Sequence, residues 1–453
     1  MRTSDSIELE VVDIKELLCL RSPNLEISLG CCKLFENLLT RIQNVRYIDL
    51  FSGCGGLSLG LKNAGFEGVF AVEKSPDAFG TFQHNLLRGE DTHFDWPRWL
   101  PKQNLGIEEL LENFSKEIRG LRGYVDAVVG GPPCQGFSLA GRRNRDDPRN
   151  KLSELYIQTV DLVRPKYLLF ENVKGFNTKF KKADGTVDKL SYAERVKSRL
   201  EQLGYRIFSS LVNSADYGVP QVRQRYILVG VSEQHIGDST INPFDILNEI
   251  REGFLQTKGL PLTPITVNDA ISDLATTNGQ LIPHSGGEKS KFLKLAYTEP
   301  ANVNNYLRLM RSNFSGAPNS MRLARHKNST KEKFLKIQRI VSPGKSLTDE
   351  HKLELGMKKQ VLTVLDRRQA SRTVTTLPDD LLHYSEPRIL TVRENARLQS
   401  FPDWFEFRGK YTTGGNRRAV ECPRYTQVGN AVPPLLGEAL GNMLLSLENG
   451  LLD

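Results

Sequence analysis

The sequence contains little of what builds metal sites, disulfide frameworks or membrane anchors. Its six cysteines are scattered without a CxxC pair and histidine occurs only seven times, which argues against both a zinc site and a disulfide framework. No run approaches the roughly 18 consecutive apolar residues that a membrane span needs. The start, MRTSDSIELE, has neither the basic residues nor the apolar core of a signal peptide. We therefore expect no bound metal, no membrane contact, and a protein of the cytoplasm, or of the nucleoid if the source is bacterial.

What is present is an ordinary globular composition with a basic balance. The chain has 453 residues, of which 39% are hydrophobic and 25% charged, and a formal net charge of +8. This length suffices for two or three domains with a substantial core. A positive balance suits a polyanionic partner, because each phosphate that a protein neutralises releases counterions, although charge carries no information on sequence preference.

Residues 125–138, VDAVVGGPPCQGFS, hold the most informative pattern. The apolar run 125–129 has the length and β-branched content of a buried strand, and two glycines and two prolines end it abruptly. Cys134 then stands at the carboxyl end of the predicted strand, where open α/β sheets bind ligands. A lone cysteine is most often a small buried hydrophobe, but Gln135 and Ser138 surround this thiol with polar side chains. We interpret Cys134 as a nucleophile.

An earlier strand, predicted over residues 46–50, leads into a glycine-rich turn and a helix. The loop reads FSGCGG, and its glycines are Gly53, Gly55 and Gly56. They permit a tight turn and let backbone N–H groups approach a ligand at the helix start. The strand predicted over 68–72 ends at Glu73, at the spacing where an acidic residue accepts hydrogen bonds from ribose hydroxyls. The pattern indicates a nucleotide-like cofactor other than NAD, because the loop is not GxGxxG.

Further charged residues occur on or beside later predicted strands. Residues 166–171 read as a strand that ends in Glu171. Arg223 and Arg225 alternate on one face of a strand predicted to run to Val231. A basic loop follows Cys134 directly and is well placed to clamp phosphates; its arginines include Arg142, Arg143 and Arg145.

Taken in order, these motifs resemble one known family, the C5-cytosine DNA methyltransferases. DLFSGCGG, the acidic ribose partner, PPCQ, ENV, QVRQR and GNAVP follow one another at plausible separations within residues 47–449. One such string is weak support, but six in order are not expected by chance. The resemblance implies an α/β fold with the Rossmann-like, mostly parallel sheet of S-adenosylmethionine-dependent methyltransferases and a second, smaller target-recognition domain.

The resemblance also implies a cofactor, S-adenosylmethionine, with S-adenosylhomocysteine as product. Phe51 would lie against the adenine ring or the methionine moiety, and Glu73 would bind the ribose. Asp95 is the candidate for the acid that accepts from the adenine amino group, with Asp91 as the alternative. The other implied cofactor-binding residues are Ser52, Gly53, Gly55, Gly56, Pro133, Asn430 and Val432.

For the reaction, the resemblance implies that Cys134 adds to C6 of a cytosine flipped out of the duplex. Glu171 would hydrogen-bond or protonate N3, Arg225 would contact O2, and we interpret Arg223 as a supporting residue. The DNA-binding residues expected on the same basis are Gln135, Ser138, Arg142, Arg143, Arg145 and Thr375. No metal takes part in this chemistry.

The sequence divides into five expected segments. They are a helical N-terminal extension (1–45), a catalytic and cofactor-binding domain (46–234), a target-recognition domain (235–385), a hinge (386–424) and a return to the catalytic domain (425–453). The stretch 235–370 shows basic strings but no strongly periodic long element. In the hinge, Thr391 precedes Glu394 at capping-box spacing, which predicts a helix over 391–399.

Two other classes of protein remain open. A tRNA cytosine-5 methyltransferase has a similar architecture but carries a Cys-Phe-Thr signature in its recognition region, whereas no cysteine occurs here between Cys134 and Cys422. A non-catalytic DNA-binding regulatory homologue should have lost the nucleophile or the acid, and both are present. We favour a sequence-specific DNA (cytosine-5-)-methyltransferase of a restriction-modification system, acting on double-stranded DNA as a monomer beside a separately encoded restriction endonuclease.

Overall fold

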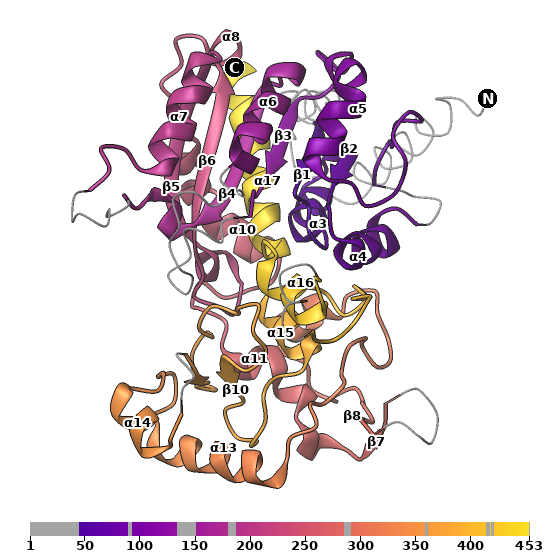
Figure 1. The fold of residues 1–453 in the computed structure, drawn as a ribbon, viewed down its shortest axis with the longest axis vertical. Helices are drawn as coiled ribbons and strands as arrows, with labels where there is room; N and C mark the ends of the chain where they lie inside the picture. Colours follow the sequence, from indigo (N-terminus) through magenta and orange to yellow (C-terminus); the bar gives the residue numbers. More distant parts are fainter. Residues whose placement is uncertain are drawn as a thin grey trace, which may run out of the picture. The chain divides into compact units, whose positions relative to one another are not determined.

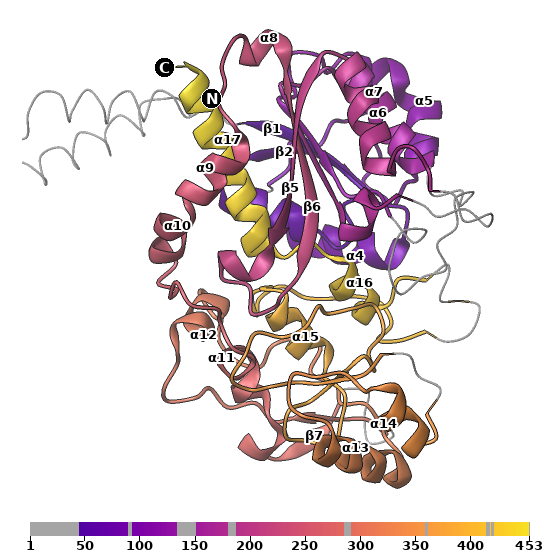
Figure 2. The same cartoon turned by 90° about the vertical axis from the view of Figure 1, so that its left-hand side faces the viewer.

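The structure is a computed structural model that describes residues 45–88, 93–133, 151–179, 187–284, 291–357, 361–413, 417 and 421–452. The predicted N-terminal extension, apart from Val45, lies outside these residues. Figures 1 and 2 show the described chain from two directions.

A six-stranded sheet with the order β2-β1-β3-β4-β6-β5 forms the centre of the described chain. Its strands are β1 (Arg46–Leu50), β2 (Glu67–Val72), β3 (Ala127–Gly130), β4 (Tyr167–Val173), β5 (Tyr205–Asn213) and β6 (Gln224–Ser232). The pairs β1–β2, β1–β3 and β3–β4 are parallel. β6 runs antiparallel to both β4 and β5. The predicted mostly parallel α/β sheet is confirmed.

Helices cover both faces of this sheet, so the central strands are buried on both sides and read as continuous apolar runs. In Figure 2, α5, α6 and α7 lie on one face, and α9 and α17 lie on the other. The helices around the sheet are α3 (Gly56–Asn63), α4 (Pro76–Leu86), α5 (Ile107–Arg119), α6 (Lys151–Val163), α7 (Tyr192–Gln202), α8 (Glu233–Ile236), α9 (Pro243–Glu249), α10 (Arg251–Thr257) and α17 (Pro434–Leu452), with 3₁₀ turns η2 (Lys174–Asn177) and η3 (Ser214–Tyr217).

Two strand boundaries differ from the sequence prediction at places that matter for the site. β4 continues to Val173, so Glu171 lies inside the strand, opposite Ile227 of β6. β6 begins only at Gln224. Arg223 therefore precedes the strand, and the expectation that Arg223 and Arg225 alternate on one strand face is wrong. Before β6, Gln221 forms an isolated bridge with Ser371 of another segment.

The stretch after β6 contains mostly short elements. They are α11 (Val267–Ile271), η4 (Ser272–Leu274), η5 (Thr276–Asn278), β7 (Leu281–Pro283), β8 (Leu293–Leu295), α12 (Asn305–Met310), α13 (Asn328–Ile340), α14 (Asp349–Glu354), β9 (Thr363–Val364) and β10 (Leu381–Leu382). The stretch 235–370, for which no strongly periodic long element was expected, contains one helix of 13 residues, α13. Its pattern is weak because it buries only Phe334 and Ile337. These two belong to a hydrophobic cluster separate from that of the sheet.

The predicted capped helix is α15 (Val392–Leu398), followed later by α16 (Arg424–Asn430). Thr391 and Glu394 form the predicted capping box: the Thr391 Oγ1 accepts from the Glu394 amide at 3.1 Å, and the Glu394 carboxylate accepts from the Thr391 amide at 2.6 Å. Two arginines of α15 are fully buried. Arg397 pairs with Asp403 at 2.5 Å and with Asp273 at 3.2 Å. The helix is thereby tied to the segment after α11.

Across the described chain, no helix combines the length and the apolar character needed to cross a membrane.

The first helix of the sheet domain and the last pack closely through glycines. A Cβ added at Gly60 of α3 would stand 2.5 Å from the backbone nitrogen of Glu438 and 2.5 Å from the carbonyl oxygen of Pro434, both in α17. Neither backbone atom can move without shifting the whole helix. The absence of a side chain at Gly60 therefore sets the distance between α3 and α17.

Gly60→Ala should destabilise the protein. Alanine is a better helix former than glycine by about 1 kcal/mol, but the clash with α17 costs about 1–3 kcal/mol, so we expect a net loss in the free energy of unfolding measured by urea denaturation. Gly80→Ala in α4 is the matched control, because a Cβ there meets nothing within 4 Å, and it should be neutral or stabilising. Equal effects at both glycines would contradict the packing argument.

Asp49 of β1 is a buried carboxyl group at the heart of the sheet. It is 1% exposed and accepts a hydrogen bond of 2.5 Å from the Ser58 hydroxyl of α3. Burial raises the pKa of Asp49 to about 7, although the Ser58 bond lowers it, and the nearby Glu73 carboxylate raises it further. The group is thus poised to gain or lose a proton near neutral pH.

This pKa predicts a pH-dependent stability. An unfolded Asp has a pKa of about 3.9, so between that value and about 7 the folded state holds a proton that the unfolded state has lost. The contribution of Asp49 is fully present below the unfolded pKa and is lost as the pH rises through the folded pKa. Relative to the parent, Asp49→Asn should therefore gain stability between about pH 4 and about pH 7, by up to about 1.4 kcal/mol per pH unit. Urea denaturation across that range, with the exposed Asp238→Asn as a flat control, measures the difference; parallel curves for the two variants would refute it.

Candidate active site

The strand order creates a topological switch point between β1 and β3. From β1 the chain crosses to β2 on one side, whereas from β3 it crosses to β4 on the other. In open α/β sheets, ligands bind in the crevice beyond the carboxyl ends of the strands at such a point. The loops that start there are FSGCGG after β1 and the predicted nucleophile loop after β3.

The glycine loop is held in a tight turn. The Ser52 amide donates to the Val72 carbonyl at 3.0 Å, and the Gly55 amide donates to the Ser52 carbonyl at 2.9 Å. Phe51, Gly53 and Gly55 all have positive φ, at 63°, 58° and 96°, a conformation that glycine adopts without strain. A Cβ added at Gly53 would meet nothing within 4 Å. The hydroxyl oxygen of Ser52 is buried and has no hydrogen-bond partner in the described chain.

Glu73 faces this loop from the end of β2. Its carboxylate accepts hydrogen bonds from the Gly53 amide at 3.0 Å and from the Ser75 amide at 2.7 Å. Burial raises the pKa of Glu73, and these backbone hydrogen bonds oppose that rise. The carboxylate is therefore fixed beside the glycine loop, as an acceptor for a ligand hydroxyl must be.

The motif GNAVP, residues 429–433, packs against the start of the helix that follows the glycine loop. A Cβ at Gly56 would lie 2.2 Å from the carbonyl oxygen of Val432, so this motif touches the start of α3. Asn430 is exposed and Val432 half-buried. Residues that are almost four hundred positions apart in the sequence thus share one wall beside the glycine loop.

Glu171 and Arg225 form the ion pair at the carboxyl end of β4. The Arg225 Nε lies 2.7 Å from the Glu171 Oε1, with side chains only 10% and 13% exposed. Burial lowers the pKa of Arg225, and the Glu171 carboxylate counteracts this. A Cβ at Gly131 would lie 2.9 Å from Glu171 Oε2. The pair therefore directly borders the loop after β3.

That loop is anchored up to the residue before Cys134. The Asn172 side-chain amide donates to the Pro132 carbonyl at 3.2 Å, and Pro133 is exposed. Cys134, Gln135, Ser138, Arg142, Arg143 and Arg145 lie outside the described residues. Other predicted site residues, which the structure does describe, lie at this edge of the sheet. They are the glycine loop, Glu73, Pro133, the Glu171–Arg225 pair, Asn430 and Val432.

Arg223 and Thr375 lie close to this group with different partners. The Arg223 guanidinium is fully buried and donates to backbone carbonyls rather than to Glu171. The Thr375 hydroxyl donates to the Asp380 carboxylate at 2.6 Å and accepts from the Leu377 amide at 3.2 Å. Thr375 is half-buried.

Asp95 is not brought to the cofactor edge. Its amide donates to the carbonyl of Gly68 at the amino end of β2, and its carboxylate accepts from the Tyr124 hydroxyl at 2.8 Å. The chain then passes along β2, and Leu105 reaches Glu73, to whose carbonyl its amide donates at 2.8 Å. Sequence spacing could not foresee the extra residues that separate Asp95 from this edge.

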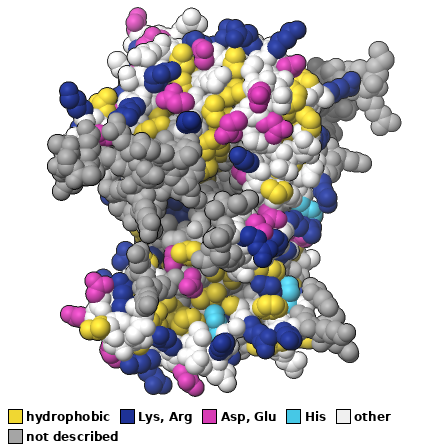
Figure 3. All heavy atoms as spheres, in the orientation of Figure 1, with side chains coloured by type: hydrophobic (Ala, Val, Ile, Leu, Met, Phe, Trp, Pro, Cys, Tyr) yellow, Lys and Arg dark blue, Asp and Glu magenta, His cyan; other side chains and the backbone are white. Residues whose placement is uncertain are grey.

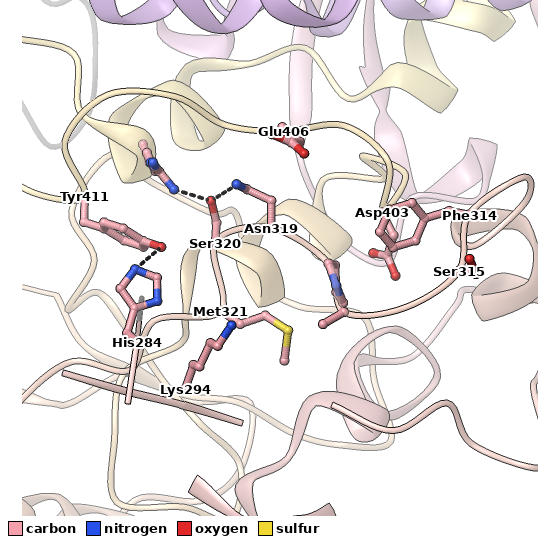
Figure 4. Close-up of a pocket in the computed structure, with 13 residues that line it drawn as sticks. His284, Lys294, Phe314, Ser315, Asn319, Ser320, Met321, Asp403, Glu406 and Tyr411 are labelled. Carbon is pink, nitrogen blue, oxygen red and sulfur yellow. Dashed lines mark hydrogen bonds between the residues drawn. The ribbon is translucent and has the colours of Figure 1, made fainter. Parts of the chain in front are cut away.

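A separate hollow of about 460 Å³ opens between the β7–β8 hairpin and the segments 314–321 and 403–411 (Figure 4). The Tyr411 hydroxyl lies 3.3 Å from the His284 Nε2, and the Arg424 guanidinium stacks 4.4 Å from the centre of the Tyr411 ring. None of the predicted site residues that the structure describes lines this hollow. It is distinct from the edge at the switch point.

We also looked for a metal centre among the residues that the structure describes. Among the described residues, no group of three or more His, Cys, Asp or Glu side chains is arranged to hold a metal ion. The arrangement instead supplies a glycine-rich cradle, an acidic acceptor and a buried carboxylate–guanidinium pair.

Comparison with known proteins extends these observations. The family model of C-5 cytosine-specific DNA methylases matches residues 45–446. Type II methyltransferase M1.HphI of Haemophilus parahaemolyticus is 31% identical, over 93% of this chain and 92% of the relative. Type II methyltransferase M.XorII of Xanthomonas oryzae pv. oryzae is 30% identical, over 88% and 84%.

A solved structure agrees with the fold. The crystal structure of a DNA modification methyltransferase encoded within an Escherichia coli prophage is 25% identical, with a TM-score of 0.55, over 89% of this chain and 99% of that one. The match of the family model spans the sheet, the glycine loop, the Glu171–Arg225 pair and the C-terminal motif. The chain belongs to the C-5 cytosine-specific DNA methylase family and is an enzyme of the DNA (cytosine-5) methyltransferase class.

Proposed function

We propose that the protein transfers a methyl group from S-adenosylmethionine to C5 of a cytosine in a specific double-stranded DNA site, as the modification enzyme of a type II restriction-modification system. The observation that carries the proposal is the buried Glu171–Arg225 pair at the switch point, which borders the loop leading to Cys134. The relatives named type II methyltransferases support the biological role.

The residues at the glycine loop fit S-adenosylmethionine. Ser52 offers a buried hydroxyl without a partner among the described residues, Gly53 leaves open space, and Glu73 presents a fixed acceptor for ribose hydroxyls. Phe51, Asn430 and Val432 would complete the binding surface, with Gly55, Gly56 and Pro133 at its margins. The cofactor supplies an electrophilic methyl group. We leave Asp95 out of this set because of its place at the other end of β2.

Cys134 acts as the nucleophile in this proposal. Cytosine C5 is a poor nucleophile within an aromatic ring, and addition of a thiolate to C6 converts it into an enamine carbon that can attack the methyl group. The π electron pair of the former C5–C6 double bond would form the new bond to the methyl carbon, while the methyl–sulfur bond breaks and leaves its electron pair on the sulfur of S-adenosylhomocysteine. A base then removes the C5 proton, and the C5–C6 double bond re-forms as the thiolate leaves.

Glu171 and Arg225 stabilise the charge that this addition places on the ring. Thiolate addition drives electron density to N3 and O2, so a carboxyl group that donates a proton or hydrogen bond at N3 and a guanidinium at O2 lower the barrier. Burial strengthens both interactions because the local dielectric constant is low. The 2.7 Å contact between the two side chains suits N3 and O2, which are both bonded to C2 of the same base.

The target carbon is inaccessible inside a duplex, so the base must be flipped out at a cost of a few kcal/mol. Phosphate contacts offset this cost, and we assign them to Gln135, Ser138, Thr375 and the arginines Arg142, Arg143 and Arg145. Figure 3 shows Lys and Arg side chains exposed both on the elements around the sheet and on the elements around α13. We propose that DNA binds along the face that carries them.

We further propose that the enzyme works as a monomer in the bacterial cytoplasm or nucleoid, beside a separately encoded endonuclease. The type II relatives cover most of the chain and favour DNA over tRNA as substrate.

Bisulfite sequencing of DNA from a methylation-free host that expresses this chain tests the proposal. We expect protected cytosines confined to one short motif, and none with Cys134→Ser, because the serine hydroxyl is too weak an acid to form the nucleophile. The Cys134→Ser protein should still bind the cofactor and DNA. Protection that persists in the variant would remove Cys134 from the mechanism, and no protection with the parent protein would contradict the proposed reaction.

Glu171→Gln should slow methyl transfer by roughly 10²–10⁴-fold, the usual contribution of a positioned general acid. The substituted side chain keeps the shape and a hydrogen bond to Arg225 but cannot supply a proton. Single-turnover transfer of labelled methyl groups measures the rate. Glu67→Gln is the matched control, because Glu67 pairs with Arg46 at the opposite end of the sheet; its rate should equal that of the parent. An unchanged rate for Glu171→Gln would exclude the acid role.

A further inference from the structure

One buried cation, Arg223, lies next to the site and is held by carbonyl groups instead of a carboxylate. Arg223 is 1% exposed, and its guanidinium donates to the carbonyl oxygens of Val374 at 2.9 Å, Gly429 at 2.9 Å and Ala431 at 3.2 Å. Burial and the nearby Arg225 lower the pKa of Arg223 well below its ordinary value. Arg223 is thus buried without a direct carboxylate partner in the described chain, so what its guanidinium connects matters more than its charge.

The three carbonyl groups belong to two segments that meet at Arg223, the residue just before the strand of Arg225. Val374 immediately precedes Thr375, to which we assign a DNA contact, and Gly429 and Ala431 enclose Asn430 of the cofactor surface. Arg225 lies two residues beyond Arg223. One guanidinium therefore connects the sites proposed for the target base, the DNA backbone and the cofactor.

The backbone of Arg223 cannot yield to movements of these segments. Its amide donates to the Asn213 side chain at 3.2 Å, and its carbonyl accepts from the Ser214 amide at 3.0 Å. Both partners stand at the end of β5. The guanidinium is therefore anchored to the sheet, and a shift of either segment strains its hydrogen bonds.

Two glutamines complete the junction. The Gln221 side chain accepts from the Val374 amide at 2.7 Å and donates to the Gln399 side chain at 2.8 Å. Gln399 in turn donates to the carbonyls of Val428 at 2.7 Å and Ala431 at 3.3 Å. The Ala431 carbonyl is thus shared by Gln399 and Arg223.

The two segments also touch directly, with no space between them. A Cβ added at Gly429 would lie 2.3 Å from the carbonyl oxygen of Thr375. Interiors packed this tightly transmit displacement. A ligand that pulls Asn430 towards itself must therefore move Thr375 or break the bonds of Arg223, and a phosphate that pulls Thr375 has the reverse effect.

We propose that Arg223 is a positioning residue that makes the binding of cofactor and of target DNA interdependent. The inference rests on the proposed function, since it takes the cofactor and DNA as the two ligands. Each ligand fixes the junction in the arrangement that the other requires, so either one raises the affinity for the other by the same factor, as linkage demands. Arg223 contacts neither ligand in this role.

The test measures a binding cycle. Fluorescence anisotropy gives the Kd of a duplex carrying the motif found by bisulfite sequencing, with and without saturating S-adenosylhomocysteine; calorimetry gives the Kd of S-adenosylhomocysteine with and without the duplex. We expect the parent protein to show a coupling factor of about tenfold in both directions, equivalent to about 1.4 kcal/mol. In Arg223→Lys the coupling factor should fall to about one, because the compact ammonium group donates from one nitrogen and does not reproduce the planar fork that reaches Val374 from one nitrogen and Gly429 and Ala431 from the other. The proposal requires that fall, whether or not the separate affinities change.

Arg393→Lys is the matched control. Arg393 is also fully buried and donates to three carbonyl groups, those of Asn319, Pro402 and Phe405 at 2.9, 3.0 and 2.6 Å. Its guanidinium also lies 3.8 Å from the Asp403 carboxylate, and none of these partners belongs to the two segments that hold Arg223. It should lose stability and keep the coupling factor. If Arg223→Lys does not fold, Gln399→Met, which removes the second donor to Ala431, should lower the factor in its place.

The outcomes separate this inference from the proposed function. A parent protein that binds both ligands without coupling, or a folded Arg223→Lys that keeps the parent factor, overturns the inference and leaves the reaction untouched. If Arg223→Lys does not fold, a Gln399→Met protein that keeps the parent coupling factor also overturns the inference. Equal loss in Arg393→Lys would reduce Arg223 to a structural residue. A parent protein that binds neither S-adenosylhomocysteine nor DNA overturns both proposals together.

Discussion

The antiparallel pairing of β4 with β6 is the constraint on which the site depends. Because β6 runs against its neighbour, its first residues meet the last residues of β4, at the edge where the parallel strands end. Arg225 therefore faces Val173, and its side chain reaches Glu171. A parallel β6 would have placed the arginine at the opposite end of the sheet, leaving Glu171 without its partner. The direction of one strand thus decides whether acid and cation meet.

Ionisable side chains gather at the edge of the sheet where the parallel strands end. Carboxyl ends of strands, a helix start and a glycine turn all present backbone groups to a small volume, which favours polar ligands. The protein adds Asp49, Glu73, Glu171 and Arg225 there, all largely removed from water. Desolvation disfavours the charged forms of Asp49, Glu73 and Arg225. Each of the four side chains is held by a hydrogen bond or an ion pair, which offsets part of the cost of burying it.

Sequence patterns predicted the parts of this arrangement that depend on local order. Strand, glycine turn and helix follow each other within a few residues, and the capping box at Thr391 is read from two side chains. Contacts between segments that are far apart in the sequence were harder to predict from local patterns. Asp95 has the right type and rough spacing, but the chain reaches the cofactor edge only at Leu105. Arg223 and Arg225 look equivalent in QVRQR, yet one binds carbonyls and the other a carboxylate. α13 escaped detection because just two of its side chains are buried.

The close packing of α3 against α17 also has a consequence for how the molecule is made. The glycine loop and the motif around Asn430 form one wall, but the ribosome synthesises α3 long before α17. The nascent chain can pair β1 with β2 early, whereas the wall beside Gly56 must wait for the C-terminal helix to leave the exit tunnel and dock. DNA methylation by the chain can therefore begin only after that helix has been translated and has docked against α3.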